Sequence, residues 1–91
     1  MTADRPPKRR DIYRLIDTER ERQLKLWGRH HQWGTGDCSS ALVDMPVKLA
    51  VLTEEVGEVA RAILDRDDTN LRDELVQVAA VAIAMIEGLD T

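Results

Sequence analysis

Two short acidic clusters interrupt the most apolar helical stretches of this 91-residue chain. The first cluster is Glu54-Glu55-x-x-Glu58, and the second contains Glu74, with Gln77 three residues later. Side chains three residues apart lie on one face of a helix. A carboxylate is costly to bury unless it is neutralised, paired or bound to a metal. Two such helices packed side by side would bring these carboxylates and the amide to one place.

The apolar periodicity of the chain predicts an all-α fold with three helices in the protomer. Gly28 ends the first helix, Pro46 lies in the first turn of the second, and Asn70 caps the third, with Asp73 near its positive end. A short charged turn over residues 65–69 joins the last two helices into an antiparallel hairpin. The helices are expected over residues 8–27 (or 11–27), 44–64 and 70–88.

The remaining segments are expected to be irregular. Residues 1–7 form a disordered lead, and residues 8–91 form a single domain. Residues 28–43 form a loop rich in Gly, Ser and Asp, and loops of this length are often functional. The ring-bearing side chains of this loop are His30, His31 and Trp33.

An apolar seam follows the second helix with steps of 3, 4, 3 and 4 residues, so we expect it to face the core. Glu55 and Glu58 border this seam when residues are placed at the helical angle. A solvated surface position is the alternative for this pair, because glutamate is a good helix former. The seam consists of Leu49, Leu52, Val56, Val59 and Ile63.

Glu74 falls on the most apolar line of the third helix, and Gln77 lies on the same side. A helix that is apolar nearly all round is buried on most sides, so Glu74 should be buried and should have a partner. The alternative to a metal site is a buried ion pair between Glu74 and Lys48 or Arg72. We favour the metal site, because the hairpin brings both acidic clusters into register.

Composition limits the classes of partner. The net charge of −4 argues against a general nucleic-acid binder. The longest apolar run, residues 78–86, is too short to span a bilayer. The single cysteine, Cys38, allows no intrachain disulfide and indicates a reduced, cytoplasmic compartment. Aromatic residues make up only 3% and Phe is absent, so the core must be aliphatic and is expected to be shared between subunits.

An all-oxygen cluster favours Mg²⁺, or Mn²⁺, as the bound ion. The chain has no C-x-x-C and no H-E-x-x-H pattern, which argues against zinc. Mg²⁺ keeps several waters and commonly bridges to phosphates. A phosphoanhydride is therefore the natural substrate class for such a site.

The acidic pattern resembles that of a known family. The run VLTEEVGEVARAILDRDDTNLRDELVQVAAVAIAMIEGL, residues 51–89, is similar to the MazG-like, all-α nucleoside triphosphate pyrophosphohydrolases. The motif of that family is E-E-x-x-E, a spacer, and E-x-x-D. Here Glu54-Glu55-x-x-Glu58 and Glu74-x-x-Gln77 are separated by fifteen residues. The run ERERQLKLWG, residues 19–28, resembles the first helix of the family.

The resemblance implies Mg²⁺-dependent hydrolysis of an NTP or dNTP between the α- and β-phosphates, with a nucleoside monophosphate and pyrophosphate as products. It implies a helical protomer that assembles into a dimer or tetramer, with sites near the subunit boundaries. Glu55, Glu58 and Glu74 take the metal-ligand positions. Glu54 takes an additional acidic position among the catalytic residues.

Gln77 takes the fourth metal-ligand position, where the family pattern has Asp. An amide oxygen is neutral, so the site loses one negative charge. Three interpretations follow: hydrolysis with fewer or weaker metal ions, a shifted substrate, or a nucleotide- or metal-binding regulatory protein without catalysis. We favour retained hydrolysis, because the other acidic positions are intact. A structural dimerisation hairpin with salt-bridged glutamates is the remaining alternative.

Candidates for substrate binding come from the first helix and the loop. Trp27 and Trp33 could stack on a nucleobase, and Gln23 could hydrogen-bond a base edge; Glu19 lies near the same line. Core or interface packing is the alternative for the tryptophans, and a solvated surface for the two polar residues. Candidates for phosphate binding are Lys48, Arg22 and Lys25, with pairing to Glu55 as the alternative for Lys48.

Overall fold

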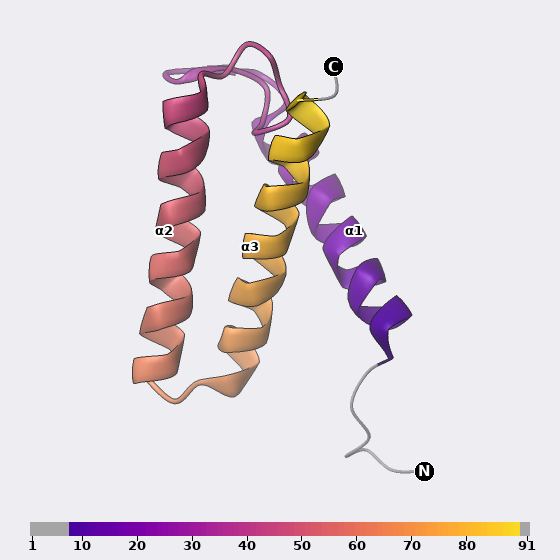
Figure 1. Cartoon of the computed structure of the whole chain (residues 1–91), viewed down its shortest axis with the longest axis vertical. Helices are drawn as coiled ribbons and strands as arrows, with labels where there is room; N and C mark the ends of the chain where they lie inside the picture. The colour runs from indigo at the N-terminus through magenta and orange to yellow at the C-terminus, as the bar shows by residue number, and fades with distance from the viewer. Residues whose placement is uncertain (1–7, 90–91) are drawn as a thin grey trace.

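The computed structural model describes residues 8–89, which form three helices and one small hairpin. Helix α3 lies between α1 and α2 and contacts both of them (Figure 1). The three predicted helices and the antiparallel α2–α3 hairpin are therefore confirmed, whereas the predicted lead, residues 1–7, lies outside the described residues. The elements are α1 (Arg9–Trp27), β1 (His30–His31), β2 (Gly34–Thr35), α2 (Met45–Leu64) and α3 (Asp68–Leu89).

Helix α1 begins and ends where its sequence signals predict. The Lys8 backbone N–H donates to the Asp11 carboxylate at 3.2 Å, which satisfies one of the backbone donors that a helix start leaves unpaired. At the other end the Gly28 N–H donates to the Leu24 carbonyl at 2.9 Å. These contacts fix the length of α1.

The start of α3 differs from the prediction. The helix begins at Asp68, so Asn70 lies inside its first turn and does not cap it. The Asn70 backbone N–H instead donates to Oδ1 of Asp67 at 3.1 Å. Asp67 directly precedes the helix, and its carboxylate, not the side chain of Asn70, caps the helix.

The core between α2 and α3 is built from small side chains. Ala62, Ala80 and Ala84 are 1%, 0% and 0% exposed, and Val81 is buried beside them. Small residues let two helices approach closely. This close approach brings polar side chains of α2 and α3 within reach of each other.

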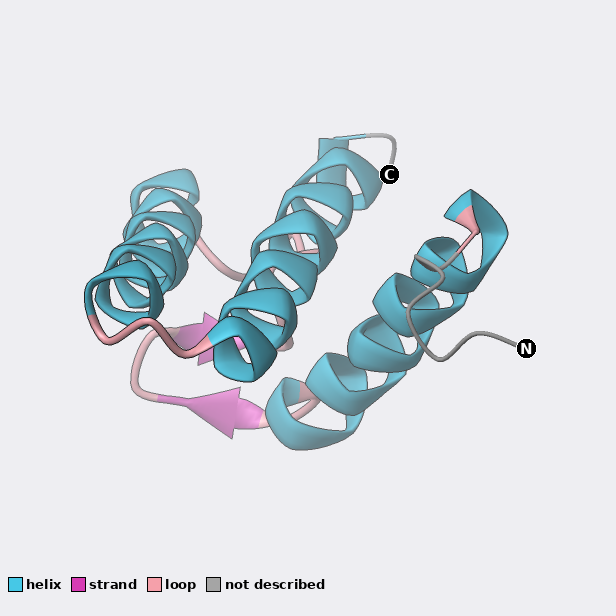
Figure 2. Cartoon of the chain, turned by 90° about the horizontal axis from the view of Figure 1, so that it is seen from below, coloured by secondary structure: helices cyan, strands magenta, loops and turns pink. Residues whose placement is uncertain are grey.

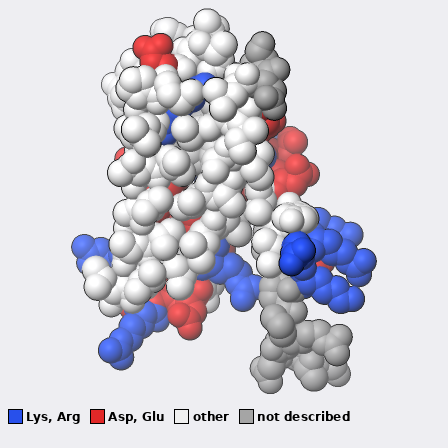
Figure 3. All heavy atoms as spheres, viewed as in Figure 1, with Lys and Arg blue, Asp and Glu red and all other residues white. Residues whose placement is uncertain are grey.

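The predicted apolar seam of α2 faces this core only in part, because Leu52 and Val59 are half-buried and the other three residues are exposed. Leu49, Val56 and Ile63 are 57%, 51% and 58% exposed, whereas Lys48 and Ala62 are the buried residues of the helix. The prediction was wrong for Leu49, Val56 and Ile63, because the stripe that packs inward, with Lys48 and Ala62, lies beside the seam on the helix surface. Figure 3 shows a broad surface over α2 and α3 that carries few charged groups.

The predicted loop, residues 28–43, contains a short antiparallel hairpin. His30 pairs with Thr35, and His31 pairs with Gly34. Gly34 has φ of 138° and also forms an isolated bridge with Val43, where a Cβ would collide with the Leu42 carbonyl. Figure 2 shows the hairpin on one side of the helices. The loop is therefore an ordered wall beside α1 and α2.

None of the helices in the described range combines the length and apolarity that crossing a bilayer requires.

Candidate active site

Three glutamates of α2 lie close together. Glu54, Glu55 and Glu58 each offer one carboxylate oxygen, and these oxygens lie within 4.8 Å of one another. Their spacing along one helix brings them to this distance, because residues one turn apart are neighbours on the helix surface. Three negative charges this close repel each other unless a cation or a proton lies among them.

Glu74 adds a fourth carboxyl group from α3. Glu74 is 9% exposed, as its position in an apolar line predicted. Burial, a hydrogen bond with the Glu58 carboxyl group and the negative charges of Glu58 and Glu55 raise the pKa of Glu74 to about 7. Burial and the neighbouring glutamates also raise the pKa of Glu55. The site therefore holds more negative charge than its surroundings compensate.

Two oxygens of this cluster are buried without a hydrogen-bond partner among residues 8–89: Oε2 of Glu55 and Oε2 of Glu74. Unpartnered buried oxygens are costly in a folded protein. A divalent cation with oxygen ligands would satisfy both atoms and offset the mutual repulsion. The donor set therefore fits Mg²⁺ or Mn²⁺. Gln77 lies three residues beyond Glu74 on α3 and is half-buried.

The ion pairs that we considered for these glutamates do not form among the described residues. Neither Lys48 nor Arg72 makes an ion pair with Glu74, and Lys48 does not pair with Glu55. Lys48 is 4% exposed, and its Nζ lies near Gly88, at the far end of α3, where an added Cβ would be 3.0 Å away. Its ammonium group therefore points away from the acidic cluster.

A cavity of about 460 Å³ opens beside the carboxylates, and Glu54 and Glu55 form part of its lining. Helices α1 and α2 and the loop between them supply most of the remaining wall. Such a volume is typical of small-ligand sites. Three rings gather at one wall: the centroids of Trp27 and His31 are 5.4 Å apart, and Trp33 lies 6.3 and 6.1 Å from them. The cavity thus has an aromatic part and an acidic part.

The polar residues of α1 face this cavity in different ways. Arg22 donates two hydrogen bonds of 2.8 Å to Glu19, and both residues line the cavity. Gln23 is buried and also lines it. Lys25 is exposed and is not part of the lining. Of the predicted phosphate-binding cations, only Arg22 therefore reaches the cavity.

The roles of Asp37 and Arg20 were not predicted from the sequence. Asp37, in the loop, lines the cavity and is hydrogen-bonded to Arg20 of α1 at 2.6 Å. Irregular loops lack the periodicity that places helical residues on a face. The length and turn composition of residues 28–43 predicted that the loop has a functional role. They did not indicate which of its side chains point inward.

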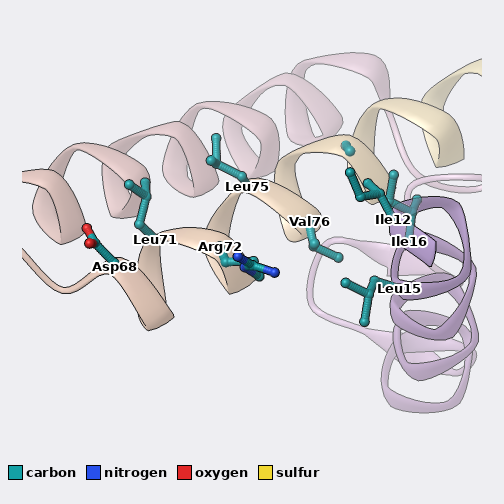
Figure 4. A pocket seen from close by; sticks show the side chains of 9 residues that line it. Ile12, Leu15, Ile16, Asp68, Leu71, Arg72, Leu75 and Val76 are labelled. Carbon is teal, nitrogen blue, oxygen red and sulfur yellow. The ribbon is translucent and has the colours of Figure 1, made fainter. Parts of the chain in front are cut away.

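A second hollow lies between α1 and α3, with a volume of about 410 Å³ (Figure 4). Leu15 and Ile16 of α1 lie opposite Val76 of α3. Within the part of the chain that the structure describes, its charged lining residues are Asp68 and Arg72, and none of the four glutamates takes part. It therefore offers no chemistry comparable to that of the acidic cluster.

The fold and the site define an all-α protein with carboxylates gathered across a helix hairpin. The model of the MazG nucleotide pyrophosphohydrolase domain matches residues 47–88, a range that holds all four glutamates. This match, which covers just under half of the chain, supports membership of the MazG-like family. No curated protein and no solved structure matches it. Helix α1 and the loop, which form the aromatic part of the cavity, lie outside the matched residues.

Proposed function

We propose that this protein hydrolyses a nucleoside triphosphate or deoxynucleoside triphosphate between its α- and β-phosphates, with Mg²⁺ as the cofactor. A nucleoside monophosphate and pyrophosphate are the products. The observation that carries the proposal is the pair of buried, unpartnered oxygens of Glu55 and Glu74 beside a cavity with an aromatic wall. Membership of the MazG family supports the reaction class.

The metal-binding role falls to Glu55, Glu58 and Glu74, with the amide oxygen of Gln77 as the fourth candidate ligand. When bound, the ion neutralises phosphate oxygens and lowers the pKa of a coordinated water. Glu54 is exposed and lines the cavity. Its carboxylate is placed to orient the attacking water and to accept its proton.

The nucleoside binds at the aromatic wall of the cavity. Trp27 and Trp33 offer faces for stacking on a base, and Gln23 offers its amide to the base edge. Arg22 offers its guanidinium to the phosphates, because it can exchange the Glu19 carboxylate for a phosphate in the same bidentate geometry. Lys48 and Lys25 have no part in this arrangement, since one is buried elsewhere and the other lies outside the cavity.

We further propose that the protein works as a dimer or tetramer. The exposed apolar residues of α2 support this assembly, because contiguous apolar surface is unfavourable in water. The family resemblance gives the same expectation. Covering the α2 seam would give Leu49, Val56 and Ile63 the buried environment that a single chain lacks.

One observation favours a non-catalytic nucleotide- or metal-binding protein as the second candidate. Gln77 stands where the family motif has Asp, so the site has one fewer negative charge. Lower charge weakens the binding of a second metal ion. The four glutamates of the cluster favour retained hydrolysis over this alternative.

Pyrophosphate release from each NTP and dNTP, with and without Mg²⁺, tests the proposal on the native protein. We expect Mg²⁺-dependent release that falls by at least about a hundredfold in Glu55→Gln. Loss of a residue that only hydrogen-bonds to a metal ligand lowers activity by about 10–100-fold, and loss of the ligand itself should have a larger effect. For Gln77→Asp, we expect half-maximal activity at a lower Mg²⁺ concentration, and a maximal activity equal to or higher than that of the native protein. Nucleotide binding without turnover in the native protein would leave the regulatory alternative in its place.

A further inference from the structure

The guanidinium group of Arg20 joins three parts of the molecule. It donates to Asp37 of the loop at 2.6 Å, to Gln23 of α1 at 2.9 Å and to Glu87 of α3 at 2.8 Å. The Arg20 side chain is 7% exposed, and that of Asp37 is 4% exposed. Arg20 itself does not line the cavity, but two of its partners, Asp37 and Gln23, do.

Asp37 is held from both of its carboxylate oxygens. Oδ2 accepts from Arg20, while Oδ1 accepts from the Ser39 backbone N–H at 2.9 Å and from the Ser39 hydroxyl at 2.5 Å. These bonds fix the loop segment that follows the hairpin. Since the same loop supplies His31 and Trp33, the position of the aromatic wall depends on this anchor.

Gln23 is fixed in one orientation by its neighbours. Arginine can only donate hydrogen bonds, so the Gln23 oxygen must face Arg20. The Gln23 amide nitrogen then faces the Glu19 carboxylate at 3.3 Å. The amide therefore cannot turn over without breaking both contacts.

A buried ion pair of this kind adds little net stability. Removing two charges from water offsets much of their attraction, and apolar replacements of equal volume are often as stable. Its main effect is to fix the positions of the groups that it joins. Arg20 holds Asp37 of the loop and Gln23 of α1, and both of these residues line the cavity.

We infer that Arg20 is the positioning residue of the nucleoside end of the cavity, which it sets by holding Asp37 and Gln23 in place. The inference rests on the proposed function, because it takes the ligand to be a nucleotide. The acidic cluster lies across α2 and α3 and does not depend on Arg20 for its geometry. Loss of the anchor should thus weaken nucleotide binding and leave metal binding unchanged.

Both tryptophans of the chain lie at the cavity, so their fluorescence reports binding there. The experiment titrates the full-length protein, in Mg²⁺, with α,β-methylene analogues of the nucleoside triphosphates, which cannot be cleaved at the proposed position. The first variant is Asp37→Asn, which removes the charge that Arg20 binds. The second is Glu87→Ala, which removes a half-exposed partner of Arg20 that does not line the cavity. Arg61→Met removes an exposed ion pair with Asp65 and is the matched control.

For Asp37→Asn we expect a Kd raised about tenfold, since small misplacement of binding groups has large effects. For Glu87→Ala we expect a smaller rise in the same direction, and for Arg61→Met none. The increase in Tm caused by Mg²⁺ alone should be equal in all four proteins. Because Glu87→Ala changes only a half-exposed side chain, it tests the inference even if Asp37→Asn does not fold.

Unchanged Kd values in the folded variants, even with a lower Tm, would show that Arg20 has only a structural role and would overturn the inference. An equal loss of Mg²⁺ and nucleotide binding would overturn it as well, since the anchor would then act on the acidic cluster. Analogue binding by the native protein without pyrophosphate release from natural nucleotides would overturn the proposed hydrolysis alone. Absence of analogue binding by the native protein would overturn both.

Discussion

Glu74 can change its charge near neutral pH, because its pKa is raised to about 7 by burial and by the neighbouring glutamates. The ordinary pKa of a glutamate in an unfolded chain lies near 4.3. Between these two values the folded state holds a proton that the unfolded state releases. This group therefore stabilises the metal-free fold at low pH, and its contribution is lost as the pH rises through about 7.

We predict that the Tm of the metal-free protein falls as the pH rises from 5 to 8, and that Mg²⁺ offsets the fall at pH 8 by replacing the proton. Glu74→Gln keeps the shape and removes the charge, so its Tm should change less over this range. Thermal unfolding followed by circular dichroism, with and without Mg²⁺, measures both effects. The same slope in the native protein and in Glu74→Gln would contradict the assigned titration.

The burial of Glu74 could be predicted from the sequence, because the apolar residues around it on a single helix define its surroundings. The roles of Arg20 and Asp37 could not. Arg20 lies in a run of charged residues that is typical of a solvated helix surface, and its partners come from a loop and from the far end of the chain. Contacts between distant segments leave no periodic trace in the sequence.

The extents of α1 and α2 were predictable, because caps and helix breakers are local signals, whereas the start of α3 was placed two residues too late. The rotation of α2 about its axis was not. The apolar seam suggested one inward face, whereas the neighbouring stripe with Lys48 and Ala62 packs against the rest of the chain. An apolar pattern indicates that one face of a helix is suited to burial. It does not indicate whether the same chain or another copy of it would cover that face.

Two glycines in helices should respond oppositely to substitution by alanine. No atom lies within 4 Å of a Cβ added at Gly57, so Gly57→Ala should raise the free energy of unfolding by about 0.5–1 kcal/mol through helix propensity. A Cβ at Gly88 would lie 3.0 Å from Lys48 Nζ and 3.1 Å from the Ser39 carbonyl oxygen. Gly88→Ala should therefore lower it by about 1 kcal/mol.

Urea unfolding of the two variants and the native protein, at one protein concentration, measures these changes. The fixed concentration matters because association would itself contribute to stability. A stabilised Gly88→Ala would contradict the close packing of α3 against Lys48 and the loop. A destabilised Gly57→Ala would show that the surface of α2 around Gly57 contacts another copy of the chain.

The described part of the molecule places many large apolar side chains at its surface, and its fully buried core consists of small residues. A chain of this length buries a small share of its surface when it folds alone. Association of copies is the simplest way to bury the remainder. The described single chain leaves room for such an assembly on the seam of α2.

We expect the native protein to be a dimer or tetramer at micromolar concentration, measured by light scattering coupled to size-exclusion chromatography. Ile63→Lys should shift it towards the monomer, because a charge would be buried in the interface. Leu42→Lys is the control, since Leu42 is 69% exposed in the loop and does not belong to the seam. A monomeric native protein would contradict the assembly, and an unaffected Ile63→Lys would place the interface elsewhere.

Metal binding by the glutamates of α2 and α3 is measured most directly by Mn²⁺ titration with electron paramagnetic resonance, because bound Mn²⁺ loses the sharp signal of the hydrated ion. We predict saturable binding by the native protein that Mg²⁺ competes away, and an affinity at least about a hundredfold lower in Glu58→Gln. Asp65→Asn, which removes an exposed carboxylate outside the cluster, should bind as the native protein does. Equal Mn²⁺ affinity in Glu58→Gln and the native protein, or no saturable binding in either, would contradict a metal site at this hairpin.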